Sequence, residues 1–204
     1  MKLSIRHFFL LSLVILSAPI LLFTQRLMTL PDPSEVSQTL HQLHVADQNG
    51  RFAGFNTPIK LASIMVGDWW RVRQVRRMVA ANLLVTAADH ANAARILQHG
   101  SQLSDFQLAH ELSLTAHEMG DGSMLRHAAL AEDRILVTQG LPQKFGSQFL
   151  CDAQTGWQLH PVDKQITDEE RLAANVEPLD NMQAKMAQLN EATSSQCNFS
   201  AETM

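Results

Sequence analysis

Residues 127–149 read HAALAEDRILVTQGLPQKFGSQF, an alanine-rich segment that runs into a polar loop. Apolar side chains fall on so many sides of its first half that we expect a largely buried helix. Asp133 and Arg134 lie within this apolar run, and charged groups that are buried need partners. The segment therefore predicts a polar site inside a helical core.

The loop after this helix is the second half of that site. Gly140 indicates the end of the helix, and Pro142 prevents its continuation. Gln143 and Gln148 then flank a flexible Gly146. Their amide groups are able to hydrogen-bond either an uncharged polar ligand or the backbone of the loop itself. The sequence leaves both roles open.

Asp133 and Arg134 are neighbours on the helix, so their side chains point about 100° apart and each requires its own partner. Other parts of the chain offer candidates of opposite charge, which are Arg51, Arg95 and Arg171 for Asp133, and Asp47 and Asp89 for Arg134. Such a buried ion network is most often structural, although catalytic sites contain similar ones.

Hydrophobic periodicity and helix-stop residues predict a mainly α-helical, compact multi-helix domain with a small β-hairpin. Helices are expected at residues 36–49, 60–85, 86–98, 104–119, 123–139, 168–174 and 180–192, with the hairpin between 147 and 163. Thr167 and Glu170 form a capping-box pattern at the start of the helix 168–174. The expected divisions are an N-terminal hydrophobic membrane helix (1–28), a linker (29–35), the helical domain (36–194) and a polar tail (195–204).

Residues 8–23 read FFLLSLVILSAPILLF, 16 positions without a charge. Ala18 is followed by Pro19 and further large apolar residues, which is unlike a cleavage site for a signal peptide. We therefore favour a signal anchor over a cleaved signal peptide, with a buried core helix as the third alternative. Lys2 and Arg6 precede the segment and Arg26 follows it, so the N-terminus is expected inside. The expected location is the inner membrane of a bacterium, with the domain facing the periplasm.

The formal net charge of the chain is −4, and the part after residue 28 carries 20 acidic against 13 basic side chains. This excess of negative charge disfavours nucleic acid as a partner. Cys151 and Cys197 both follow the hydrophobic segment, and an even number of cysteines in an oxidising compartment predicts a disulfide between them. Two free thiols are the alternative if the domain is not exported.

One helix face carries the histidine that we regard as the strongest candidate for proton exchange. His110, Ser113 and His117 fall on the same face of the helix 104–119. Such a stripe is a solvated surface, a set of buried histidines with hydrogen-bond partners, or part of a site. His117 is favoured because it lies at the helix end beside a flexible turn with Gly120 and Gly122.

Motifs for other chemistries are missing from the sequence. It contains no HExxH or CxxC pattern, and the loop after residue 142 lacks the glycine spacing of a phosphate cradle. A hydrolase built from Ser147, His117 and Asp133 would need a Gly-x-Ser-x-Gly turn that the chain does not have. We therefore expect no metal and no cofactor.

A basic run, RVRQVRR, occupies residues 71–77. Arg73, Arg76 and Arg77 share one helical face there. This pattern favours pairing with acidic neighbours, or contact with the anionic headgroups of a membrane next to an anchored domain.

Several short patterns of this sequence occur together in a known order. They are Asp47, Gln48 and Arg51; Asp89 and Asn92; His99 and Gly100; His117; Asp133 and Arg134; Gly140, Gln143, Phe145, Gly146 and Gln148; and Arg171. Over residues 36–180 the chain resembles a family of bacterial proteins of unassigned function. In that family an Asp-Gln-x-x-Arg helix, a His-Gly turn, an Asp-Arg helix and a Gln-x-Tyr-Gly-Thr-Gln loop follow one another.

The chain departs from this family pattern in several places. Phe145 and Ser147 replace the usual Tyr and Thr, and no Trp-Pro follows the His-Gly turn. Thr115 and Ala116 precede His117 where Gln is common. The resemblance implies a mostly helical domain with a shared polar pocket, and it names no substrate.

These features lead to one hypothesis and one alternative. A pocket formed by His117, Asp133, Arg134, Gln143 and Gln148, with Asp47, Arg51 and Asp89 as further binding residues, would hold a small polar ligand of the cell envelope, with or without catalysis. In the catalytic version His117 exchanges protons and Arg134 holds an anionic or carbonyl group. In the alternative, a scaffold without enzymatic activity, the same residues lock the helices together.

Overall fold

The structure is a computed structural model that describes residues 29–52, 57–152 and 154–192. Two compact units divide the chain, Met1–Asp32 and Pro33–Met204, and the second contains all the helices and strands below. The predicted membrane segment 8–23, Cys197 and the polar tail lie outside the described residues. Within the described ranges, no helix combines the length and the apolar character that a membrane span requires.

The second unit is mainly helical, with one antiparallel hairpin of two strands, which confirms the predicted helical domain with a small hairpin, while the N-terminal membrane helix stays a prediction. Its elements are the short 3-10 turn η1 (Pro33–Glu35), α2 (Val36–Phe52), α3 (Pro58–Ala80), α4 (Ala87–Leu97), α5 (Leu103–Glu118), α6 (Met124–Thr138), β1 (Phe149–Asp152), β2 (Gly156–Leu159), α7 (Asp168–Ala173) and α8 (Leu179–Ala192).

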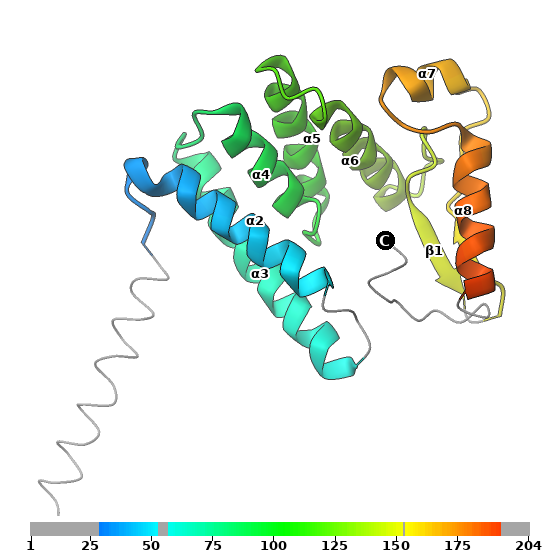
Figure 1. The fold of residues 1–204 in the computed structure, drawn as a ribbon, viewed down its shortest axis with the longest axis horizontal. Helices are drawn as coiled ribbons and strands as arrows, with labels where there is room; N and C mark the ends of the chain where they lie inside the picture. The colour runs from blue at the N-terminus through cyan, green and yellow to red at the C-terminus, as the bar shows by residue number, and fades with distance from the viewer. Residues whose placement is uncertain (1–28, 53–56, 153, 193–204) are drawn as a thin grey trace, which may run out of the picture. The chain divides into compact units, whose positions relative to one another are not determined.

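Five helices build the core. α2 packs on α3 and on α4, α4 packs on α5, and α5 packs on α6 (Figure 1). Alanine fills many of the contact positions on α4, α5 and α6, so these helix axes can approach closely. The buried core residues are Val36, Leu40, Val72, Val75, Met78, Ala91, Ala93, Ala94, Ile96, Leu97, Ala109, Leu112, Ala116, Met124 and Ala131.

Local signals in the sequence set several helix ends. The predicted capping box of α7 is confirmed, because Thr167 Oγ1 accepts the Glu170 N–H at 3.2 Å and Glu170 Oε2 accepts the Thr167 N–H at 2.7 Å. Gly140 has a φ of +74° just after α6, which is the left-handed conformation expected of a glycine at a helix end. Thr57 caps α3 and Pro58 occupies its first turn.

The predicted helix 60–85 ends earlier than expected, at Ala80. Asn82 adopts a left-handed φ of +54°, and the Leu83 N–H donates to the Met78 carbonyl oxygen at 3.1 Å. This arrangement is a helix C-terminal motif in which asparagine takes the place of the usual glycine. Because asparagine is a weaker stop signal than glycine, the sequence pattern did not reveal it.

The β-hairpin follows the polar loop after α6 and packs against α8. Cys151 lies opposite Trp157 in the strand register. Asn190 of α8 fixes the hairpin, since its side chain accepts the Trp157 N–H at 2.6 Å and donates to the Trp157 carbonyl oxygen at 2.9 Å. The disulfide between Cys151 and Cys197 stays a prediction.

Candidate functional site

The Asp133 carboxylate holds the backbone of the loop after α6. Its Oδ1 accepts the N–H groups of Lys144 at 2.7 Å and Phe145 at 2.9 Å. Its Oδ2 accepts the N–H and the hydroxyl of Ser147 at 2.9 and 2.8 Å. Asp133 is fully buried, and its partners are these loop groups rather than the arginines expected from the sequence. Four hydrogen bonds stabilise the buried charge and leave the carboxylate a structural role.

The side-chain amides of the two glutamines of this loop also form hydrogen bonds with other groups of the protein. Gln143 is fully buried, and its Nε2 donates to the carbonyl oxygens of Gln148 at 2.8 Å and His160 at 2.9 Å. Its Oε1 accepts the Gln148 N–H at 2.8 Å. The Gln148 side chain donates to the Leu130 carbonyl oxygen at 3.3 Å and accepts from Arg134 Nε at 3.0 Å. Of the two roles left open by the sequence, these amides therefore hold the loop in place and do not face a ligand site.

Arg134 links α6 to the end of α4. Its Nη1 donates to the Gln98 carbonyl oxygen, and its guanidinium lies 5.6 Å from the centroid of the Phe106 ring. Neither Asp47 nor Asp89, the carboxylates expected from the sequence, forms a described ion pair with Arg134. Asp89 instead caps α4, where its Oδ2 accepts the N–H groups of Val85 and Thr86 at 3.1 and 2.9 Å.

His117 lies apart from Asp133 and Arg134 in this arrangement. Arg134 contacts Phe106, which is eleven residues before His117 on α5, or about 16 Å along the helix axis. His117 is half-buried, and its Nδ1 is buried without a described hydrogen-bond partner. No described contact joins His117 to the other four residues of the predicted pocket. The prediction that His117 shares a pocket with Asp133, Arg134, Gln143 and Gln148 is therefore wrong.

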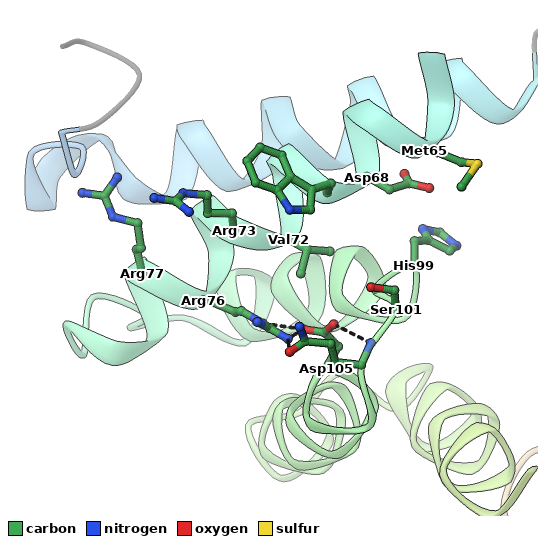
Figure 2. Close-up of a pocket in the computed structure, with 12 residues that line it drawn as sticks. Met65, Asp68, Val72, Arg73, Arg76, Arg77, His99, Ser101 and Asp105 are labelled. Atoms are coloured by element: carbon green, nitrogen blue, oxygen red, sulfur yellow. Dashed lines mark hydrogen bonds and ion pairs between the residues drawn. The ribbon is translucent and has the colours of Figure 1, made fainter. Parts of the chain in front are cut away.

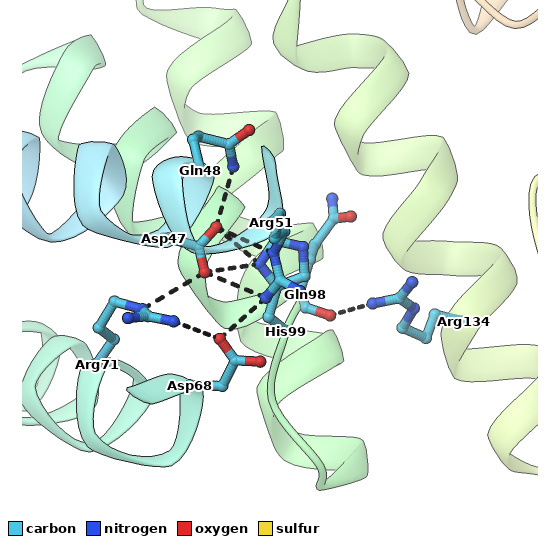
Figure 3. Close-up of polar contacts among 8 residues, drawn as sticks. All are labelled: Asp47, Gln48, Arg51, Asp68, Arg71, Gln98, His99 and Arg134. Carbon is cyan, nitrogen blue, oxygen red and sulfur yellow. Dashed lines mark hydrogen bonds and ion pairs between the residues drawn. The ribbon is translucent and has the colours of Figure 1, made fainter. Parts of the chain in front are cut away.

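A different cluster of charged residues forms between α2, α3 and the end of α4 (Figure 3). Asp47 of α2 is fully buried and lies 3.2 Å from Arg51 Nη2 and 3.4 Å from Arg71 Nε. Asp68 of α3 lies 2.9 Å from Arg51 Nη2 and 2.6 Å from Arg71 Nη2. Two carboxylates thus alternate with two guanidinium groups, and each charge faces an opposite one. The predicted residues Asp47 and Arg51 meet here.

His99 completes this cluster and was not among the residues that the sequence singled out as a site. Its Nδ1 lies 3.1 Å from Asp47 Oδ1 and 3.0 Å from Asp47 Oδ2. No described residue hydrogen-bonds to its Nε2, and 26% of the side chain is exposed. Asp47 and His99 are 52 positions apart in the sequence.

Burial and neighbouring charges set the protonation of this pair. Burial raises the pKa of Asp47, but the hydrogen bond from His99 and the charges of His99 and Arg51 outweigh it and hold that pKa well below its ordinary value. Burial lowers the pKa of His99, the hydrogen bond to Asp47 raises it, and the net direction is downward. At neutral pH we expect an ionised Asp47 that accepts the Nδ1–H of a neutral His99. The Nε2 lone pair is then free to accept a proton.

The His99 imidazole lines a groove with a volume of about 780 Å³ (Figure 2). Side chains of α3 form one side of this groove, and the α4–α5 turn with the start of α5 forms the other. Its lining residues are Met65, Asp68, Trp69, Val72, Arg73, Arg76, Arg77, His99, Gly100, Ser101, Gln102 and Asp105. None of the five residues of the predicted pocket belongs to this lining.

The arginines of the groove are engaged to different degrees. Arg76 forms an ion pair with the buried Asp105 and donates to Gln102 Oε1 at 2.8 Å, so its charge is largely balanced. Arg73 is exposed and makes no ion pair within the described residues, and its guanidinium lies 5.7 Å from the Trp69 ring centroid. Arg73 therefore offers an uncompensated positive charge at the groove rim, beside an aromatic surface.

Gly100 allows the turn between His99 and α5 to close. A Cβ at Gly100 would overlap the Asp105 side chain, which caps α5 by accepting the Gln102 N–H at 3.1 Å and also holds Arg76. The close approach explains why a glycine follows His99. It also ties the position of His99 to the α5 cap.

The Gly100→Ala variant is expected to unfold more easily by about 1 to 3 kcal/mol, because Asp105 has to move and its bonds to Arg76 and Gln102 weaken. Gly122→Ala is the matched control, since a Cβ at Gly122 meets nothing within 4 Å. Chemical denaturation of both variants measures the difference. Equal stabilities of the two variants would show that the Asp105 side chain does not fill this space.

Three histidines predict a loss of stability in mild acid. Burial is the largest cause that lowers the pKa of His44, His99 and His127 below the ordinary value of 6.5. As the pH falls below 6.5, the unfolded chain takes up protons that the folded protein resists, so the free energy of unfolding decreases. We expect this decrease between about pH 7 and pH 5, above the range in which carboxylates titrate.

Urea denaturation at a series of pH values measures this dependence, and the slope should become shallower in His99→Gln. A free energy of unfolding that stays constant or rises from pH 7 to pH 5 would contradict the burial of these imidazoles.

Among the described residues, no three side chains of histidine, cysteine, aspartate or glutamate are placed to hold a metal ion. Comparison of the chain with known protein families, with curated proteins and with solved structures finds no match. What the site does is therefore inferred from its geometry.

Proposed function

We propose that this protein binds a small anionic ligand in the groove between α3 and the α4–α5 turn, and that His99 exchanges a proton with it. The observation that carries this proposal is the hydrogen bond between the buried Asp47 carboxylate and His99 Nδ1 at 3.1 Å, which leaves Nε2 as a proton acceptor on a groove-lining ring.

The groove suits a ligand with two chemically different parts. Arg73 supplies a positive charge for a phosphate or carboxylate group. Trp69 and Val72 supply apolar surface for a neighbouring ring or hydrocarbon group. A volume of about 780 Å³ is in the range of sites for small molecules.

The place of this activity rests on sequence alone. Residues 8–23 would anchor the chain in the inner membrane of a bacterium, so that the groove faces the periplasm. An oxidising periplasm would also allow the disulfide between Cys151 and Cys197. The ligand would then be a small polar component of the cell envelope.

A second candidate function, a scaffold without enzymatic activity, is favoured by a specific observation. The polar atoms of Asp133, Gln143 and Asp89 all bind groups of the fold itself. These residues stabilise the fold whether the protein binds a ligand or acts as a scaffold. The two functions differ in whether the groove binds a ligand and whether the pKa of His99 changes when it does.

Phenyl phosphate is a suitable probe, because it combines a ring with a phosphate. The full chain, with its histidine rings isotopically labelled, is titrated with the probe in a non-ionic detergent and followed by NMR. We expect the His99 resonance to shift and its pKa to rise, since the bound anion favours the imidazolium. Arg73→Gln should weaken binding about tenfold, as expected for one lost charge-assisted hydrogen bond.

Two controls make this experiment specific. Phenol has the ring without the charge and should bind far more weakly. Arg126→Gln removes an exposed arginine of α6 that does not line the groove, and should bind as the unchanged protein does. A His99 resonance that does not respond to phenyl phosphate, or an equal response in Arg73→Gln, would leave the scaffold as the better account.

A further inference from the structure

The first half of α3 exposes an unusual amount of apolar surface. Ile59 is 83% exposed, Val66 is 67% exposed and Trp69 is 61% exposed. These three residues and Arg73 lie within one helical face, because their spacings of seven, three and four residues are close to whole turns. We call this set the α3 stripe. Ile64 and Val75 on the opposite side of the same helix are buried.

An exposed apolar stripe of this kind marks a contact surface. α3 carries five basic side chains and a single acidic one, whereas the whole chain has a formal net charge of −4. Two of the five, Arg71 and Arg76, form ion pairs with aspartates, so they add little to the charge of the stripe. The positive charges concentrate at the C-terminal end, where Arg73 and Arg77 follow Trp69 along the same helix. Along α3, the exposed face is therefore apolar at its N-terminal end and positively charged at its C-terminal end.

We infer that the α3 stripe docks on the surface of a lipid bilayer that contains anionic phospholipids. Tryptophan favours the boundary between headgroups and acyl chains, and Ile59 and Val66 would enter the acyl region. Arg73 is able to extend its apolar stem along this boundary while its guanidinium reaches a phosphate. The negative remainder of the protein is repelled by such a surface, which favours the approach of α3 first.

This contact does not require the hydrophobic segment 8–23, and it can be tested apart from ligand binding in the groove. Trp69 and Arg73 belong both to the stripe and to the groove lining, whereas Ile59 and Val66 do not line the groove. A docked α3 would place the groove next to the lipid headgroups. Variants at Ile59 and Val66 therefore separate membrane docking from binding in the groove.

Fluorescence quenching by brominated lipids tests the docking. The full chain is mixed with vesicles of phosphatidylcholine, with or without phosphatidylglycerol, whose acyl chains are brominated near their carbonyl ends. We expect tryptophan emission to be quenched several-fold more in the anionic vesicles. The Trp69→Phe variant should lose most of this quenching, although Trp70 and Trp157 remain. All variants carry the same residues 1–28, so insertion of that segment affects them equally.

The double variant Ile59→Ser and Val66→Ser should reduce the quenching while it leaves the phenyl phosphate response of His99 unchanged. Docking is overturned if the emission is not quenched in anionic vesicles, or is quenched equally in both compositions. A shift of the Trp69 emission to the blue without quenching by the brominated chains also overturns it, because a second copy of the protein would then cover the stripe.

Discussion

Replacement of Asp133 by asparagine is expected to lower the free energy of unfolding by about 3 to 5 kcal/mol. Each of the two carboxylate oxygens of Asp133 accepts two hydrogen bonds from the loop that starts after α6. An amide presents an NH2 group to one of these pairs, so donors would face donors in a fully buried position. The loop would lose its anchor, and the polypeptide between α6 and the hairpin would lose its fixed path.

Glu132→Gln is the matched control for this prediction. Glu132 is the preceding residue on α6, and its partner Lys144 Nζ is an exposed side chain rather than buried backbone. We expect a change below about 1 kcal/mol for this partly exposed pair. Urea denaturation of both variants gives the comparison. A cost for Asp133→Asn as small as that of Glu132→Gln would mean that the loop does not depend on Asp133.

Replacement of Asp47 by asparagine is expected to have two effects of different kinds. The first is a loss of stability of about 2 to 4 kcal/mol, because a fully buried carboxylate that faces Arg51 and Arg71 is removed. Asp68 remains beside both arginines and limits the cost. The second is a further fall in the pKa of His99, since the hydrogen bond and the charge of Asp47 are what raise it.

Asp68→Asn separates these two effects. Asp68 contacts the same arginines as Asp47, but it makes no described contact with His99. The control variant should therefore lose stability without the fall in the pKa of His99. NMR titration of the histidine rings, together with urea denaturation, measures both quantities. Equal pKa values of His99 in the two variants would show that Asp47 does not determine its protonation.

Much of this fold follows from local patterns in the sequence. Periodicity and stop residues placed the helices, and the pair Thr167 and Glu170 marked the start of α7. The end of α3 at Ala80 was missed, because it depends on a left-handed asparagine at position 82. Such a stop is set by one backbone conformation, which the side-chain pattern shows only weakly.

The site followed from the sequence less well than the fold. Asp133 was recognised as a buried charge, but its partners are backbone N–H groups, which every residue except proline carries. No pattern of side chains can identify such partners. The expected pairing with arginines assumed that a charge needs an opposite charge, whereas four directed hydrogen bonds serve equally well.

Asp47 was expected as a binding residue and His99 as part of the family pattern, but their pairing was missed for a different reason. Its members lie on α2 and just after α4, and only the packing of α2 on α4 brings them together. One signal was nevertheless present, since His99 precedes a glycine whose missing side chain lets the turn close against Asp105. A histidine held beside such a turn is a reasonable candidate in the absence of a structure.

We infer that the buried Asp47 carboxylate holds His99 as a neutral imidazole with its Nε2 open to the groove. The tautomer of His99 depends on this contact, and ¹⁵N NMR of the ring nitrogens at neutral pH determines the tautomer. We predict a protonated Nδ1 and an unprotonated Nε2. A proton on Nε2 with none on Nδ1, or an imidazolium at neutral pH, would contradict the account.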